Sequence, residues 1–231
     1  SRGLKNLNDA LDIRDSILKA FEKAENEKNT ELKQSYLNFV IIGGGPTGVE
    51  LAGSIAELAY KNINNEYRNL NTNDINVYLV EAGTEILPEY STGLSAKASK
   101  YLERLGVILK LNEKVINIED KKVITEKKTY ETNNIIWAAG NIANPLIAKL
   151  NTDVDNFGRV MVKDDFSINK NNSIFVIGDA AHYKGKNDRP LPGIAPVAIQ
   201  QGKYLAKKLT LNINKENNKN FKYKDKGMMA T

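Results

Sequence analysis

A short apolar stretch at residues 39–42 runs directly into the sequence GGGPTG at residues 43–48 and then into a helix start. A strand, a glycine-rich turn and a helix in that order are what a dinucleotide pyrophosphate site requires. Gly43 permits a tight turn, Gly45 lets the backbone approach a phosphate closely, and Gly48 lets the helix pack on the strand. The helix amides then face the anion. The pattern predicts a dinucleotide site, and the alternative is a glycine turn that serves packing alone.

The next expected strand, residues 75–80, ends at Glu81. A carboxylate there accepts hydrogen bonds from ribose hydroxyls and repels a 2′-phosphate, so NAD is favoured over NADP. The spacing from the glycines exceeds the typical ~20 residues. We attribute the excess to the polar stretch 61–74, interpreted as a helix end plus a surface insertion. The alternative for Glu81 is a solvated carboxylate at a strand end.

A second candidate site lies further along the chain, where the expected strand at residues 173–177 ends in Gly178 and Asp179. Gly178 lets a ligand approach closely, and Asp179 offers an acceptor to a polyol hydroxyl. Alone, this pattern fits a strand-to-helix turn with an aspartate cap equally well. With a dinucleotide fold upstream, it indicates the second nucleotide contact of a two-dinucleotide flavoenzyme.

Composition narrows the function. The 231 residues are 41% hydrophobic, enough for one and a half to two cores, and no apolar run approaches the ~18 residues of a membrane span. The absence of cysteine excludes disulfides, thiolate metal sites and a Cys-x-x-Cys redox pair within this sequence. The formal charge of +5 is mild, and the Lys and Asn richness lacks interleaved aromatics, so nucleic-acid binding is not expected.

Several stretches together resemble the type II NADH dehydrogenases, the single-subunit NADH:quinone oxidoreductases of the FAD-dependent pyridine nucleotide-disulfide oxidoreductase superfamily. The matching stretches are residues 7–14, 43–50, 80–83, 86–88, 136–140, 175–179 and 191–202. The resemblance implies an α/β, two-dinucleotide-binding-domain (Rossmann-like) flavoprotein fold, with a complete NAD domain and part of the FAD domain. It also implies a longer protein, whose N-terminal FAD loop and C-terminal membrane helices lie outside this sequence.

The resemblance sets the expected domain organisation. Residues 1–35 would be a linker helix packing on the FAD domain, with Leu7, Ala10, Leu11, Ile17, Leu18, Phe21 and Ala24 on one stripe and a polar linker at 26–34. Residues 36–145 would form the NAD(H)-binding domain, including a helix from about Ser95, a meander over 107–131 and a buried strand at 134–139. Residues 146–231 would form the C-terminal half of the FAD domain, with a hairpin at Gly158, a helix at 196–209 and a loop at 212–220.

The resemblance also implies site residues. Cofactor binding falls on Gly43, Gly44, Gly45, Pro46, Thr47, Gly48, Glu81, Ala139, Gly140, Gly178, Asp179, Ala195, Pro196 and Val197, and catalytic roles fall on Glu50, Gln200 and Gln201. Glu50 is alternatively an ordinary first-turn helix acid. One of the two glutamines is alternatively a surface amide. His182 is the only histidine, and we expect a solvent-facing loop residue rather than a quinone proton donor.

The implied activity of the full-length protein is transfer of a hydride from NADH to FAD and of two electrons to a membrane quinone, without proton pumping. This chain alone is expected to be inactive. The implied partners are the quinone, the membrane surface and a second copy in a homodimer, with a peripheral location on the cytoplasmic face of the inner membrane. The alternatives are a non-catalytic NAD-binding fragment and a related flavin-dependent ferredoxin or thiol reductase.

Overall fold

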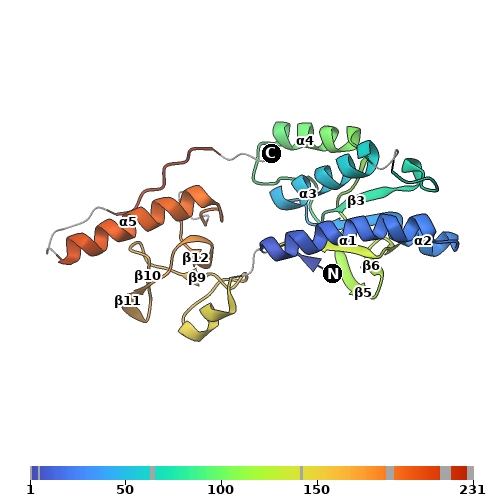
Figure 1. Cartoon of the computed structure of the whole chain (residues 1–231). Helices are drawn as coiled ribbons and strands as arrows, with labels where there is room; N and C mark the ends of the chain where they lie inside the picture. The colour runs from blue at the N-terminus through green and yellow to red at the C-terminus, as the bar shows by residue number, and fades with distance from the viewer. Residues whose placement is uncertain are drawn as a thin grey trace. The chain divides into compact units, whose positions relative to one another are not determined.

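The computed structural model describes residues 2–4, 6–62, 66–140, 143–185, 190–213 and 220–227. The described residues up to Gly140 form one compact unit, and those from residue 143 to Gly227 form a second (Figure 1). The sequence predicts a border near residue 145, slightly later than the division found here. Each unit has its own hydrophobic core.

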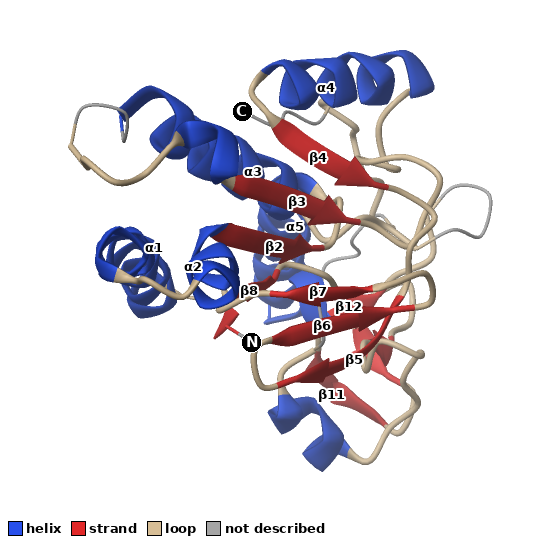
Figure 2. Cartoon of the chain, turned by 90° about the vertical axis from the view of Figure 1, so that its right-hand side faces the viewer, coloured by secondary structure: helices blue, strands red, loops and turns tan. Residues whose placement is uncertain are grey.

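A parallel five-stranded sheet forms the centre of the first unit (Figure 2). Its strands, in spatial order, are β1 (Arg2–Gly3), β8 (Asn134–Trp137), β2 (Asn38–Ile42), β3 (Asn76–Val80) and β4 (Val107–Lys110). β4 thus joins the parallel sheet and not the antiparallel meander in which the sequence analysis places it. The order reverses at β2, which has β3 on one side and β8 on the other. Ligands of such sheets bind at the carboxyl ends of the strands beside this switch point.

The two faces of the sheet are covered differently, and the alternation of side chains along β2 explains how. Phe39 and Ile41 pack in one core with α1 (Leu7–Asn26), α3 (Pro46–Glu57) and α4 (Thr92–Arg104). Val40 and Ile42 pack on the other face against the antiparallel sheet of β5 (Val115–Glu119), β6 (Lys122–Thr125) and β7 (Thr129–Glu131). A strand buried on both faces reads as a continuous apolar run, as β2 does.

Helix α1 forms as the sequence predicts but packs differently. Asn6 and Asp9 form a reciprocal capping box at its start. Its buried residues are Ile13, Ile17, Ala20, Phe21 and Ala24, all in the core of the first unit. The predicted stripe was therefore partly wrong, since Leu7, Leu11 and Leu18 are exposed. The helix contributes to the core beside the NAD-type sheet, where we expected it to pack on the flavin part.

A second helix, α2 (Thr30–Leu37), occupies most of the stretch predicted as a polar linker. The Asn29 side chain caps it by accepting a hydrogen bond from the Leu32 amide at 2.9 Å. The other short elements of this unit are a π-helical turn, η1 (Leu58–Asn62), and a 3-10 turn, η3 (Thr72–Asp74). Both fall in or beside the predicted insertion, of which residues 63–65 lie outside the described residues.

The second unit is built from short strands and one long helix. Its elements are η4 (Pro145–Leu150), β9 (Val160–Met161), β10 (Ser167–Ile168), β11 (Asn171–Phe175), η5 (Gly178–Ala180), β12 (Ala181–His182) and α5 (Ala195–Ile213). β11 begins two residues earlier than predicted and is not a core strand, because residues 171–173 are exposed. Of the loop predicted at 212–220, residues 212 and 213 belong to α5 and residues 214–219 lie outside the described residues.

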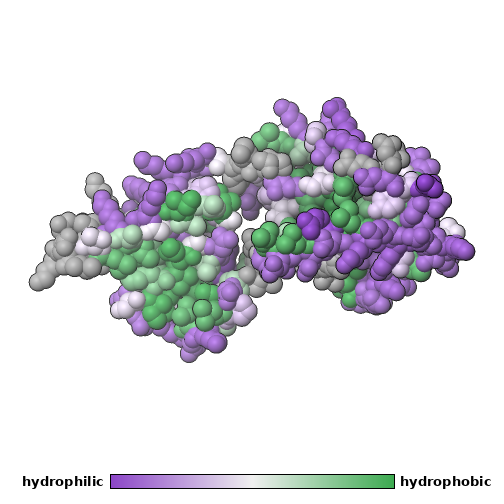
Figure 3. All heavy atoms as spheres, in the orientation of Figure 1, coloured by the Kyte–Doolittle hydropathy of each residue, from purple (hydrophilic) through white to green (hydrophobic). Residues whose placement is uncertain are grey.

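Aromatic rings fill the core beside α5. Phe166 is fully buried and contacts Tyr183, Tyr204 and Phe221, with ring centroids 4.8–5.6 Å apart. Such tilted and edge-on pairs are the favoured geometries for aromatic contacts. Phe221 thereby ties the segment 220–227 to α5. Figure 3 shows hydrophobic side chains gathered on the viewed face of this unit, and Ile199 and Leu209 of α5 are among its exposed apolar residues.

Candidate functional site

The glycine loop lies at the carboxyl end of β2, where the strand order reverses. Gly43 has φ +111°, a conformation that L side chains rarely adopt, and its amide donates to the Val80 carbonyl at 2.8 Å. A Cβ on Gly43 would lie 2.7 Å from the Ala139 backbone, and one on Gly48 would collide with the Gly43 carbonyl oxygen. The first and last glycines are therefore required by close backbone packing.

The middle glycine faces open space. Gly45 is the N-cap of α3, supplies no capping side chain, and has no atom within 4 Å of the place where a Cβ would stand. Pro46 follows at the first helical position, where its missing N–H costs nothing. The next amides, of Thr47 and Gly48, belong to the first turn of the helix, whose N-terminal dipole attracts anions. The loop therefore fits a pyrophosphate.

Glu81 is joined directly to this loop. Its Oε2 accepts a hydrogen bond from the Gly44 amide at 2.6 Å, and its Oε1 accepts one from the Gly83 amide at 2.7 Å. Each carboxylate oxygen can accept a second hydrogen bond. The side chain is half-buried at the end of β3, so it retains acceptor capacity toward solvent. Glu81 is therefore not simply a solvated strand-end acid, and no local sequence pattern indicates that Gly83 is its partner.

The backbone of Glu81 is held from the opposite side. Its amide donates to the Lys110 carbonyl at 2.9 Å, and its carbonyl accepts from the Glu113 amide at 2.9 Å. The Glu113 carboxylate is buried and accepts from Thr125 Oγ1 at 2.7 Å and from the Tyr130 hydroxyl at 2.8 Å. Burial and the bond to Glu113 raise the pKa of Tyr130 far above its ordinary value. Glu113 escaped the sequence analysis because a single acid in a polar loop carries no local signal.

Glu50 lies on α3, beyond the glycine loop. It lines a groove of ≈ 980 Å³ between α3 and α4, together with Leu87, Tyr90, Leu94 and Tyr101. Burial is the main cause that raises the pKa of Tyr90, and the negative charges of Glu50 and Glu89 raise it further. Glu50 is thus close to Tyr90 on a mainly apolar wall.

The second unit places Gly178 and Asp179 at a turn beside the start of α5. Gly178 has φ +67°, and a Cβ there would lie 3.4 Å from the Ala198 Cβ. Asp179 is exposed, and Gly193 approaches it so closely that a Cβ on Gly193 would lie 3.4 Å from Asp179 Oδ1. An exposed carboxylate at a turn flanked by glycines fits a polyol hydroxyl, as the ribityl chain of FAD would present.

The first turn of α5 begins with Ala195, Pro196 and Val197, and it packs toward this turn. Val197 is buried, whereas Ala195 is exposed and Pro196 is half-buried. The Gln201 side chain is only 1% exposed, and its Oε1 accepts from the Gly178 amide at 2.6 Å. Gln201 therefore holds the Gly178 turn.

The neighbouring glutamine is also engaged within the chain. Gln200 Nε2 donates to the Lys224 carbonyl at 2.9 Å, and its Oε1 accepts from the Lys224 amide at 3.0 Å. The predicted role of both glutamines, donation to a quinone carbonyl, differs from these contacts. The structure uses each amide to fasten backbone: Gln201 fastens the Gly178 turn and Gln200 the segment 220–227.

His182 is not a solvent-facing loop residue, so that expectation was wrong. It lies in β12, its side chain is 15% exposed, and Nδ1 is 2.9 Å from Asp155 Oδ2. Arg159 Nε donates to the same oxygen at 2.7 Å. Burial alone raises the pKa of Asp155, but the bonds from His182 and Arg159 outweigh it and hold that pKa well below its ordinary value. The cluster braces the Gly158 hairpin that the sequence predicts.

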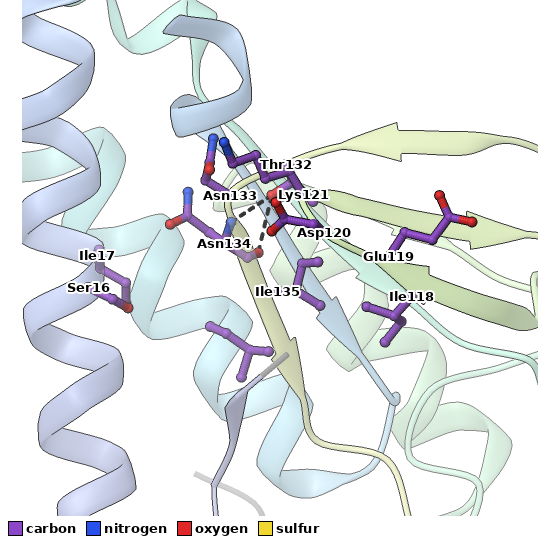
Figure 4. A pocket seen from close by; sticks show the side chains of 11 residues that line it. Ser16, Ile17, Ile118, Glu119, Asp120, Lys121, Thr132, Asn133, Asn134 and Ile135 are labelled. Atoms are coloured by element: carbon purple, nitrogen blue, oxygen red, sulfur yellow. Dashed lines mark hydrogen bonds between the residues drawn. The ribbon is translucent and has the colours of Figure 1, made fainter. Parts of the chain in front are cut away.

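Another pocket lies away from these residues. It measures ≈ 470 Å³ and is lined by Ser16 and Ile17 of α1, residues 118–121 at the β5–β6 turn, and residues 132–136 around β8 (Figure 4). The Asn134 amide donates to Thr132 Oγ1 there at 2.9 Å. This is the amino end of β8, opposite the end where parallel sheets bind ligands.

No cluster of three or more His, Cys, Asp or Glu side chains that could hold a metal ion occurs among the described residues. Within the same part of the chain, no helix combines the length and the apolar character needed to cross a membrane.

The parallel sheet, the glycine loop at its switch point and the acid at the end of β3 define a Rossmann-like α/β protein of the dinucleotide-binding class. The chain belongs to the pyridine nucleotide-disulphide oxidoreductase family, whose profile matches residues 5–202. That match confirms the fold class predicted from the sequence and the superfamily named there.

Proteins similar to this chain are consistent with that family. The chain is 35% identical over 242 residues to a type II NADH:quinone oxidoreductase of Mycobacterium tuberculosis, covering 99% of this chain and 51% of that protein. It is 32% identical over 200 residues to a type II NADH:quinone oxidoreductase of Staphylococcus aureus, covering 84% and 49%. The chain spans about half the length of the curated relatives it matches. The fold also matches NDH2 of Plasmodium falciparum in complex with NADH, with TM-score 0.89 at 20% identity, covering 100% of this chain and 63% of that one.

Proposed function

We propose that this chain is the NADH-binding part and the rear flavin-binding part of a type II NADH:quinone oxidoreductase. One observation carries the proposal. The Gly44 amide donates to Glu81 Oε2 at 2.6 Å, so the phosphate loop and the ribose acceptor form a single unit. A glycine turn that served packing alone would not need an acid tied to it. The similarity to named type II oxidoreductases supports the same activity.

In this proposal, residues 43–48 hold the pyrophosphate of NADH, Glu81 accepts from the adenosine ribose, and Ala139 with Gly140 forms the adjoining wall. The negative charge of Glu81 selects NADH over NADPH by repelling a 2′-phosphate. Glu50 lines the groove between α3 and α4 beside Tyr90, and its proposed role near the nicotinamide follows from the resemblance to the type II enzymes.

FAD, when bound, would accept the hydride of NADH and pass two electrons to the quinone. The residues of this chain would bind and orient it. Asp179 accepts from a ribityl hydroxyl, Gly178 allows the close approach, and Ala195, Pro196 and Val197 close the site from the first turn of α5. Gln201 acts on the flavin through the Gly178 turn that it holds, and Gln200 acts through the segment 220–227.

The whole protein would deliver electrons to a membrane quinone from a peripheral position on the cytoplasmic face, and it would form a homodimer. The formal charge of +5 is compatible with an anionic membrane surface. Because this sequence covers half of its relatives, contacts with the membrane and with a second copy belong to the complete protein.

The test is the acceptor specificity of the full-length protein. Purified protein should be yellow with bound flavin and should oxidise NADH with a short-chain quinone, faster than with ferredoxin or a disulfide. Preference for ferredoxin or a disulfide would identify a related reductase. Protein that binds NADH but holds no flavin and transfers no electrons would be a nucleotide-binding module.

A further inference from the structure

Trp137 is the only tryptophan of the sequence, and its ring does not serve the core. It is the last residue of β8, and 39% of its surface is exposed. Its indole Nε1–H donates to the Ala139 carbonyl, two residues ahead, at 2.6 Å. The side chain therefore closes a local turn and fixes the direction of the Ala139 carbonyl. An exposed aromatic ring used only for packing would leave its N–H to water.

The turn that Trp137 closes lies against the glycine loop and is held there by the backbone. The Ala138 amide donates to the Ile42 carbonyl at 2.8 Å, which ties the turn to the end of β2. A Cβ on Gly43 would lie 2.7 Å from both Ala139 N and Ala139 Cα. A movement of Ala139 toward the loop would thus displace Gly43, and a movement away would open the contact. Close-packed backbone transmits such shifts.

We infer that Trp137 is a positioning residue for the phosphate loop. Its N–H holds the Ala139 peptide so that Gly43 keeps φ +111° and the loop keeps the shape that receives a pyrophosphate. The inference rests on the proposed NADH binding and adds a residue that touches no ligand. It predicts a specific pattern: loss of the N–H weakens every ligand that contains a pyrophosphate and spares ligands that contain only the adenosine end.

The test compares Trp137→Phe with Tyr60→Phe in the full-length protein. Both changes keep an aromatic ring and remove side-chain donation to backbone, at one carbonyl for Trp137 and at two for Tyr60. Tyr60 makes its bonds at the other end of the sheet, donating to the Ile75 carbonyl at 2.9 Å and the Gly106 carbonyl at 3.3 Å. Calorimetric titrations with adenosine, ADP-ribose and NADH are run on wild type and both variants, together with thermal unfolding.

Trp137→Phe should raise the Kd of ADP-ribose and of NADH by the same factor, about two- to tenfold for one hydrogen bond, with the Kd of adenosine unchanged. Tyr60→Phe should lower the unfolding midpoint at least as much and leave all three Kd values unchanged. The inference is overturned if Trp137→Phe binds all ligands as wild type does, or weakens adenosine equally. In both cases NADH binding by the wild type shows that the proposed NADH site stands and that only the role of Trp137 has failed. If wild type binds neither NADH nor ADP-ribose, the proposed function and this inference both fail.

Discussion

Replacing Glu81 with glutamine should reverse much of the preference for NADH over NADPH. Glu81 accepts one backbone N–H on each oxygen, from Gly44 at 2.6 Å and from Gly83 at 2.7 Å. A glutamine has one acceptor oxygen, so its NH₂ group would face one of these two donors. The substitution therefore removes a charge-assisted hydrogen bond inside the protein, even before a nucleotide binds.

The magnitude follows from these contacts. A hydrogen bond to a charged group contributes about 1.5–3 kcal/mol, and Glu81 is half-buried, so the lower end applies to the internal bond. The internal bond exists with and without nucleotide, so its loss lowers stability, whereas the Kd changes through the ribose contact, whose loss costs about 1.5–3 kcal/mol. Each 1.4 kcal/mol is a factor of ten in Kd. The Kd of NADH should thus rise by roughly tenfold to a hundredfold, while that of NADPH falls or stays constant because the repulsion of its 2′-phosphate is removed.

The assay is a titration of the full-length protein with NADH and with NADPH, in which binding is measured as the quenching of protein fluorescence. Glu89→Gln is the matched control, because it removes an equal charge from an exposed position in the same segment. It should leave the ratio of the two Kd values unchanged. A Glu81→Gln protein with the wild-type ratio would remove Glu81 from the ribose site and refute the reasoning.

The remaining predictions concern the flavin, the buried acid and the second unit. Asp179→Ala should lower the flavin content of the full-length protein and leave the Kd of NADH unchanged; full flavin occupancy would contradict the assignment. Glu113→Ala should destabilise the protein by about 1–3 kcal/mol in chemical denaturation, because the buried Tyr130 hydroxyl loses its acceptor while Thr125 keeps the Lys128 carbonyl; a neutral effect would show that water replaces it. Acid should unfold the second unit. Burial raises the pKa of Asp165, but the bond from Lys208 lowers it more, so the net pKa falls to about 2. The pKa of Asp155 is also below its ordinary value. Stability is therefore complete above pH ~4 and lost toward pH ~2, and Asp155→Asn should flatten that dependence in circular dichroism titrations.

Local patterns determined the elements that need only neighbouring residues. The strand, glycine loop and helix at residues 39–57 follow from apolar, glycine and helical sequence in succession, and β3 ends where predicted, at Val80. The strands β5, β6 and β7 form within the meander predicted over residues 107–131. Each of these depends on steric preferences of adjacent residues, which the sequence expresses directly.

Long-range contacts decided the rest. The face that α1 buries was misjudged because the helix carries apolar residues on two sides, and only the sheet selects Ile13 and Ala20 over Leu7 and Leu11. Gln201 is a second example. The helical pattern places it near the surface, but its side chain is buried because it accepts the hydrogen bond of the Gly178 amide.

The candidate site shows the same division. The sequence by itself determined that this protein has a glycine loop, an acid after β3 and a Gly-Asp turn, because each is a local motif. Only the tertiary structure decided that Glu81 is fastened to Gly44 and that His182 pairs with Asp155. These partners are far apart along the chain, and no local preference encodes a contact that exists only after the strands have assembled beside one another.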